Sequence, residues 1–173
     1  HKECLDLTKP EEKEIYDFFA FRENRPGYLQ EQTREDQWGW LSTYPQAIFK
    51  NREGKNEQVT VGVAVNYDTK TNFISPMNGE NISGRTYTSK GYDTRENAVC
   101  YGAHFEEQWE YALKADPEFI FVTGWNEWVA MRGRMWPPED TGHGVRNAFP
   151  DQFCDAFSRD VEPSTGALKD HYY

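Results

Sequence analysis

The sequence predicts an α/β fold of parallel strands with long loops after the strands, arranged as half of a TIM-type (β/α)8 barrel. Two apolar, β-branched runs, at 59–65 and 119–123, are typical of strands buried on both faces, as in parallel sheets. An amphipathic helix is expected between them at 95–114, and alternating strands and helices favour parallel pairing. A full barrel needs roughly 200 residues or more, whereas this chain has 173. We therefore expect a portion of a larger protein, or else a smaller open α/β domain.

The remaining elements are expected in the following order. A helix at 9–17 begins with Pro10 and has acidic residues in its first turn, where the helix dipole favours them. The Phe-rich run 18–21 either extends this helix or forms a short buried strand, and 37–41 is another strand candidate. A polar loop is expected after each of the two long strands, and a last helix is expected before a turn-like tail at 162–173. The two loops and the helix are expected at 68–94, 129–149 and 150–161.

The helix at 95–114 carries apolar residues at spacings of three and four, which is the pattern of a helix with one buried face. Trp109 belongs to this face, so we interpret it as a packing residue. Asp116 and Pro117 end the helix because the residue before a proline disfavours helical geometry. The apolar face consists of Ala98, Tyr101, Phe105, Trp109, Ala112 and Leu113.

The net charge of −10 and the lack of a basic run argue against nucleic acid or an anionic membrane surface as a partner. The sequence contains no apolar run of 18 residues, so insertion into a membrane is not expected. The chain begins at His1 and not at Met, so removal of a signal peptide or of another upstream region is left open. The three cysteines and four histidines are widely spaced, so we expect free thiols, with one disulfide left open, and no metal or cofactor.

The strand at 119–123 is followed by Gly124, Trp125, Asn126, Glu127 and Trp128. The carboxyl ends of buried parallel strands open onto the ligand crevice in α/β folds. Two flanking indoles would exclude water and raise the pKa of the glutamate, which suits a general acid. The neighbouring amide can bind a sugar hydroxyl. The alternative is a core strand that ends in a structurally satisfied glutamate.

Segment 117–128 resembles the W-N-E-W signature of a broad glycoside hydrolase-like group. That group is related to glycoside hydrolase families 71 and 99 and includes bacterial proteins described as glycosyltransferases. The resemblance covers nearly the whole chain and implies that 1–173 is a catalytic-domain portion, the C-terminal half of a barrel, from an extracellular or periplasmic bacterial protein. The other similar stretches are 18–22, 37–41, 44–46, 105–109, 151–153 and 157–163.

The chain departs from family 99 at one position that matters. That family is similar in having a carboxylate where Glu127 stands, but the second carboxylate expected three residues later is Ala130 here. Glycosidases generally need two carboxyl groups, so the partner must come from elsewhere. Glu80, in the predicted loop 68–94, is the first candidate. Other candidates are Glu23, Asp36, Glu139, Asp140 and the remainder of the larger chain.

Several other side chains are candidates for substrate binding. Arg22 either orients a carboxylate or binds substrate, or it belongs to a structural ion pair. Trp38 and Trp40 alternate around a glycine and should point the same way, either to stack on sugar or to pack. Trp136 lies on a Pro-rich loop and is a better stacking platform. The charged residues of 159–162 are interpreted as a structural cluster at a helix end.

The sequence therefore predicts a glycosidase that cleaves glycosidic bonds in a polysaccharide or glycan. Glu127 would be the acid/base group, with Glu80 as its catalytic partner. Asn126 would bind substrate while Trp125 and Trp128 shape the subsite. Two alternatives remain open: a glycosyltransferase-like protein of surface polysaccharide assembly, and a non-catalytic carbohydrate-binding protein.

Overall fold

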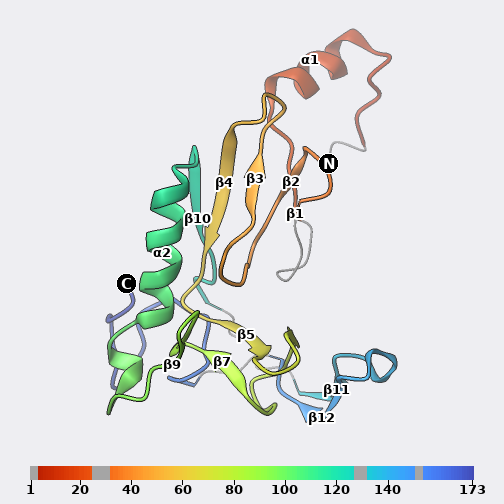
Figure 1. Cartoon of the computed structure of the whole chain (residues 1–173). Helices are drawn as coiled ribbons and strands as arrows, with labels where there is room; N and C mark the ends of the chain where they lie inside the picture. Colours follow the sequence, from red (N-terminus) through yellow and green to blue (C-terminus); the bar gives the residue numbers. More distant parts are fainter. Residues whose placement is uncertain (1–3, 25–31, 127–131, 151–153) are drawn as a thin grey trace.

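The computed structural model describes residues 4–24, 32–126, 132–150 and 154–173, and within these ranges the protein is rich in short strands. Two α-helices are present there, α1 (Pro10–Phe18) and α2 (Ala103–Ala115). Short 3-10 turns occur at Ala98–Cys100 and Glu139–Thr141. The strands form five small sheets, several of them antiparallel (Figure 1). Neither described helix is long and apolar enough to cross a bilayer.

The sheet that positions the candidate site has the order β10-β4-β3. Strand β4 (Asn56–Val61) lies in its centre, antiparallel to β3 (Ile48–Lys50) and parallel to β10 (Phe119–Val122). A second, parallel pair joins β1 (Glu23–Asn24) to β2 (Gln37–Trp38). Because β4 and β10 run in the same direction, their carboxyl ends lie at the same edge of the sheet.

Helix α2 covers one face of this sheet because its apolar side meets the alternate residues of β4. Val59, Val61 and Ala112 are fully buried between the two elements. Phe105 and Trp109 pack against them, so the predicted packing role of Trp109 is confirmed. Leu113 was expected on the same face, but it is largely exposed.

A buried glutamine ends β4 earlier than its apolar run predicts. Gln108 of α2 is fully buried, and its Oε1 accepts a hydrogen bond from the backbone N–H of Gly62 at 3.1 Å. Its Nε2 donates to the carbonyl of Ser42 at 2.8 Å. The first of these bonds occupies the N–H of Gly62, which lies outside the β-ladder. The predicted strand 59–65 is therefore split between β4 and a new strand, β5 (Val65–Asp68), which belongs to another sheet.

The segments predicted as long polar loops contain short antiparallel strands instead. Their polar residues close tight turns: the Asp68 carboxylate accepts from the backbone N–H groups of Lys70 at 2.8 Å and Thr71 at 3.0 Å. One three-stranded sheet, β6-β5-β7, and two hairpins, β8-β9 and β11-β12, are formed in this way. The strands are β6 (Phe73–Ile74), β7 (Ile82–Gly84), β8 (Tyr87–Thr88), β9 (Gly91–Tyr92), β11 (Gly133–Trp136) and β12 (Val145–Ala148).

The predicted fold class, a parallel α/β half of a TIM-type barrel, is wrong. The described residues form several small antiparallel and mixed sheets with two α-helices, and short strands follow one another where long loops were expected. The predicted helix at 150–161 is also wrong in its described part, because 154–161 form a turn and irregular chain. The helix predicted at 95–114 is confirmed only from Ala103 onward, because 98–100 form a 3-10 turn. The order of apolar runs and an amphipathic helix does not establish crossover connections.

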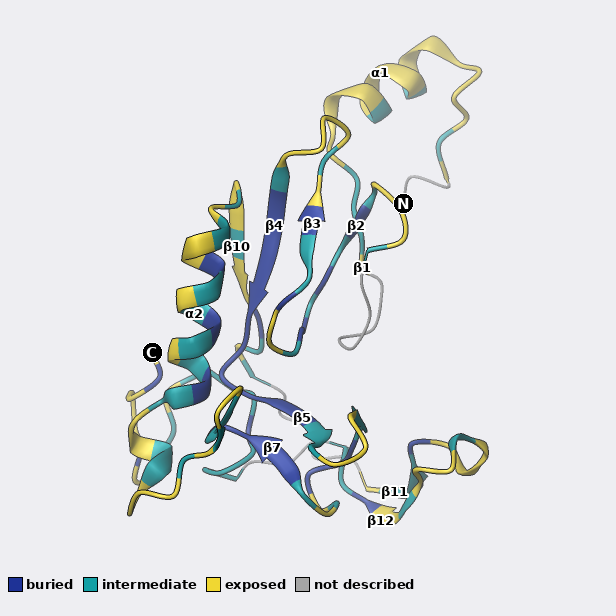
Figure 2. Cartoon of the chain, viewed as in Figure 1, coloured by how far each residue is buried: buried dark blue, intermediate teal, exposed yellow. Residues whose placement is uncertain are grey.

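Strand β10 is confirmed, whereas its expected burial on both faces is wrong. Phe119, Phe121 and Val122 expose 47%, 45% and 39% of their surface, respectively. The reason is topological: β10 is the edge strand of its sheet and pairs with β4 alone among the described strands. Figure 2 shows the contrast between buried β4 and exposed β10.

Candidate functional site

The carboxyl end of β10 leads into the predicted catalytic motif, of which Trp125 and Asn126 are described. Trp125 is 52% exposed, and its ring makes an edge contact with Tyr173 at 5.7 Å between centroids. Asn126 is half-buried. Glu127 and Trp128 lie outside the described residues. The motif therefore enters a surface region in which Trp125 is exposed to solvent.

The C-terminal segment 159–162 lies directly against this motif. The N–H of Val161 donates to the carbonyl of Gly124 at 2.8 Å, and the N–H of Glu162 donates to the carbonyl of Trp125 at 2.9 Å. Gly124 has a φ of +77°, and a Cβ placed there would lie 2.4 Å from the carbonyl oxygen of Arg159. Glycine thus allows both the left-handed backbone and the close approach of the two segments.

This contact brings a second carboxylate to the motif. The Nδ2 of Asn126 donates a hydrogen bond to Oε2 of Glu162 at 3.1 Å. The interpretation of 159–162 as a purely structural cluster therefore missed the position of Glu162. One sequence signal pointed to this segment, since 157–163 is among the stretches that resemble the glycoside hydrolase-like group. That signal carried no information on which carboxylate approaches Asn126.

A buried arginine holds the same C-terminal segment in place. Arg85 is 4% exposed, and it donates from Nε to the carbonyl of Ser158 at 2.7 Å and from Nη2 to the carbonyl of Asp160 at 2.9 Å. Its guanidinium lies 4.4 Å from the ring centroid of Tyr172. Burial lowers the pKa of Arg85 below its ordinary value. Sequence analysis did not single out this residue, because nothing local distinguishes it from a surface arginine in a loop.

The two tryptophans around Gly39 have different surroundings. Trp40 packs against the buried pair Leu41 and Val65, and the guanidinium of Arg159 lies 6.0 Å from its ring centroid. Trp38 instead donates from its indole Nε1 to Oε2 of Glu57 at 2.8 Å. These contacts support packing for Trp40 and a polar structural role for Trp38.

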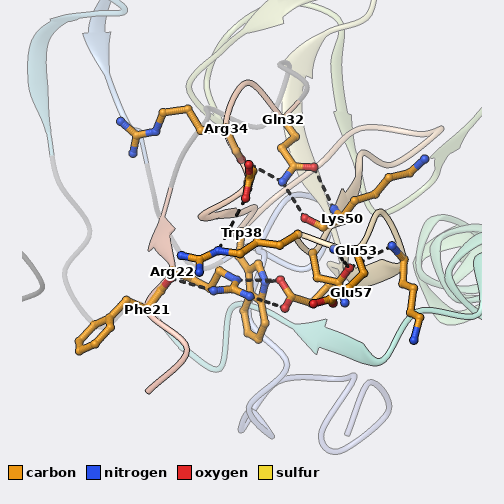
Figure 3. Close-up of polar contacts among 12 residues, drawn as sticks. Phe21, Arg22, Gln32, Arg34, Trp38, Lys50, Glu53 and Glu57 are labelled. Atoms are coloured by element: carbon orange, nitrogen blue, oxygen red, sulfur yellow. Dashed lines mark hydrogen bonds and ion pairs between the residues drawn. The ribbon is translucent and has the colours of Figure 1, made fainter. Parts of the chain in front are cut away.

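Arg22 belongs to a charge cluster with Glu57 and Trp38 (Figure 3). Its Nε donates to Oε2 of Glu57 at 2.7 Å, and its Nη2 donates to Oε1. Glu57 is the extra residue of a β-bulge, because Phe49 pairs with Gln58 while Lys50 pairs with Asn56. Bulges redirect side chains, and this one turns Glu57 towards Arg22. Of the two readings of Arg22, the structure thus supports the ion pair.

The Arg22–Glu57–Trp38 cluster lies at the amino end of β4, whereas Asn126 follows the carboxyl end of β10. Arg22 and Glu57 of this cluster line a pocket of about 310 Å³ together with Phe19 and Phe21. Both oxygens of Glu57 already accept hydrogen bonds from side chains. We therefore assign this carboxylate to structure and not to catalysis.

Glu57→Gln is expected to lower the free energy of unfolding by about 3 kcal/mol near neutral pH, since it leaves a poorly exposed guanidinium without its charge partner. The hydrogen bonds from Arg22, chiefly, and Trp38 hold the pKa of Glu57 below its ordinary value of 4.5. Its stabilising effect is therefore present above pH 4.5 and is lost as the pH falls through the lower pKa of the folded state. Urea unfolding at a series of pH values measures this loss.

The exposed Glu53→Gln is the matched control for that series. Its free energy of unfolding should fall at acidic pH as much as that of the natural protein. The free energy of unfolding of Glu57→Gln should fall less over the same pH range. Equal pH profiles for the two variants would contradict the assignment of Glu57.

The other predicted site residues lie elsewhere in the structure. Glu80 is exposed in the turn between β6 and β7, and Trp136 is half-buried at the end of β11, opposite Val145. Both belong to sheets other than that of β10. Their functional roles stay predictions.

Within the described ranges, no group of three or more histidine, cysteine, aspartate or glutamate side chains is arranged to hold a metal ion. The three cysteines are free thiols. His104 is fully buried, with Nδ1 2.8 Å from the carbonyl of Tyr87, and burial lowers its pKa. This environment fits a structural role for His104.

Comparison of the chain with protein-family models, curated proteins and solved structures finds no match. The functional argument therefore depends on the residues themselves.

Proposed function

We propose that this protein is a glycoside hydrolase-like enzyme that cleaves glycosidic bonds in a polysaccharide or glycan, with Glu127 as its acid/base group. One observation carries the proposal: an open indole, an amide and a second carboxylate meet at the two residues that precede Glu127. These groups are Trp125, Asn126 and Glu162. Together they provide the types of side chain that a site for sugar cleavage requires.

Each group has a task in this proposal. The exposed face of Trp125 stacks on a sugar ring, since indoles combine a large apolar surface with rigid geometry. Asn126 binds a hydroxyl group beside the scissile bond. Glu127 donates a proton to the leaving oxygen, and general acid catalysis of this kind contributes about 100-fold to 10,000-fold in rate.

Glu127→Gln is expected to lower turnover at least about 100-fold, because glutamine cannot donate the proton. Release of reducing ends from a panel of plant, fungal and bacterial polysaccharides measures turnover. The variant should still bind the polysaccharide that the natural protein cleaves, which calorimetry measures.

Glu14→Gln is the matched control. Glu14 is exposed on α1, and Figure 1 places α1 beyond the amino end of β4, at the opposite end of the sheet from the carboxyl end of β10. The control should keep full activity. Unchanged turnover in Glu127→Gln would contradict the proposal.

A second candidate function is non-catalytic carbohydrate binding. The exposed aromatic rings of Trp125, Phe119 and Phe121 at and beside the motif favour it, as does alanine at position 130. Polysaccharide binding by the natural protein without release of reducing ends would support this candidate over the enzyme.

A further inference from the structure

We propose that Glu162 is the second catalytic carboxylate, the partner that the sequence leaves unassigned because Ala130 stands where a carboxylate was expected. This inference rests on the proposed function. It replaces Glu80 as the leading candidate, since the Glu162 carboxylate contacts the motif directly.

Three hydrogen bonds place Glu162 beside the motif. Its own N–H donates to the carbonyl of Trp125 at 2.9 Å, and the preceding N–H, of Val161, donates to Gly124 at 2.8 Å. The Asn126 amide then binds its Oε2 at 3.1 Å. Asn126 is the residue before Glu127 in the sequence. The Glu162 carboxylate is thus anchored to the immediate chain neighbour of the proposed acid.

The position of Glu162 is maintained from both sides of the segment. Arg85 binds the carbonyls of Ser158 and Asp160 from the protein interior. Gly124 allows the backbone of Arg159 to approach closely. Catalytic groups need such support because small displacements reduce rates strongly. Glu162 itself is half-buried, so its side chain is accessible to a ligand.

The two glutamates would divide the reaction between them. As the bond from the anomeric carbon to the leaving oxygen breaks, Glu127 gives its proton to that oxygen. The Glu162 carboxylate faces the anomeric carbon. Water supplies the hydroxyl that finally bonds to this carbon, and its remaining proton returns to the carboxyl pair. The net reaction is the addition of one water molecule across the glycosidic bond.

The test uses 2,4-dinitrophenyl α- and β-glycosides of glucose, mannose and galactose, whose leaving group needs no proton. Glu162→Ala should lower turnover at least about 100-fold, and sodium azide should restore it with formation of a glycosyl azide. Glu127→Gln should lose far less activity on these substrates than on polysaccharides. Azide reaches the anomeric carbon only where removal of a catalytic carboxylate has opened space beside it, so loss of a merely structural carboxylate would not give this product.

Glu162→Gln provides a second readout, since glutamine keeps an acceptor for Asn126 and preserves the fold. Its turnover should also fall, and its pH–rate profile should lose the acidic limb that a catalytic base produces. Full activity of both Glu162 variants, or a loss that azide does not restore together with an unchanged pH profile, would overturn the inference. Absence of hydrolysis by the natural protein on every glycoside and polysaccharide would instead overturn the proposed function.

Discussion

Gly124→Ala is expected to lower the free energy of unfolding by about 4 kcal/mol. A left-handed backbone costs a residue with a Cβ about 1–2 kcal/mol, and Gly124 has a φ of +77°. The larger part comes from overlap, because the new Cβ would lie 2.4 Å from the carbonyl oxygen of Arg159. To relieve it, the segment that carries Glu162 must move away from Asn126. Urea unfolding measures the loss, and activity should fall with it.

Gly54→Ala separates the two causes. Gly54 has a φ of +78°, but nothing lies within 4 Å of its would-be Cβ. Its substitution should cost about 1–2 kcal/mol, which is the backbone term alone. Equal losses in the two variants would contradict the close approach of segment 159–162 to the motif.

Arg85→Met is expected to destabilise the protein by a similar amount, about 4 kcal/mol. The change leaves the carbonyls of Ser158 and Asp160 without their donor, at about 1–3 kcal/mol each, and removes a desolvated contact with Tyr172 worth about 2 kcal/mol. Methionine recovers part of this loss because it fills a similar volume. Hydrogen exchange should become faster at the amides of Val161 and Glu162, whose acceptors lie in the motif.

Arg95→Met is the control for Arg85. The Arg95 guanidinium also lies over a tyrosine ring, that of Tyr101, at 3.8 Å, but the group is exposed. Its loss should leave both unfolding and hydrogen exchange at residues 161 and 162 unchanged. An equally small effect of Arg85→Met would contradict the role of Arg85 in holding the C-terminal segment.

Local patterns in the sequence predicted several elements well, but not their arrangement. Helix α1, the core of helix α2 and strand β10 lie where spacing and composition indicate. The error in the extent of the strand predicted at 59–65 arose at Gly62. Its backbone N–H donates to the side chain of Gln108 on α2, and the strand ends there. A contact of this kind depends on tertiary packing, so hydrophobic periodicity does not reveal it. The short antiparallel strands of 68–94 were missed because their polar residues resemble those of a loop.

The candidate site was also predictable only where local sequence patterns determine it. Trp125 and Asn126 follow a strand, and the sequence alone indicates that such residues lie at a sheet edge. Glu162 is 36 residues from Asn126, and no spacing rule connects two positions so far apart. The ion pair was one of two roles considered for Arg22, and its partner, Glu57, became evident only from the hydrogen bonds in the structure.

The distance between the carboxyl groups of Glu127 and Glu162 in a crystal structure tests the central claim most directly. The account predicts about 5–5.5 Å for a retaining enzyme or about 6.5–9.5 Å for an inverting one. Either value would assign the stereochemical course as well as the catalytic pair. A separation well beyond about 10 Å, with Glu162 still bound to Asn126, would contradict the account.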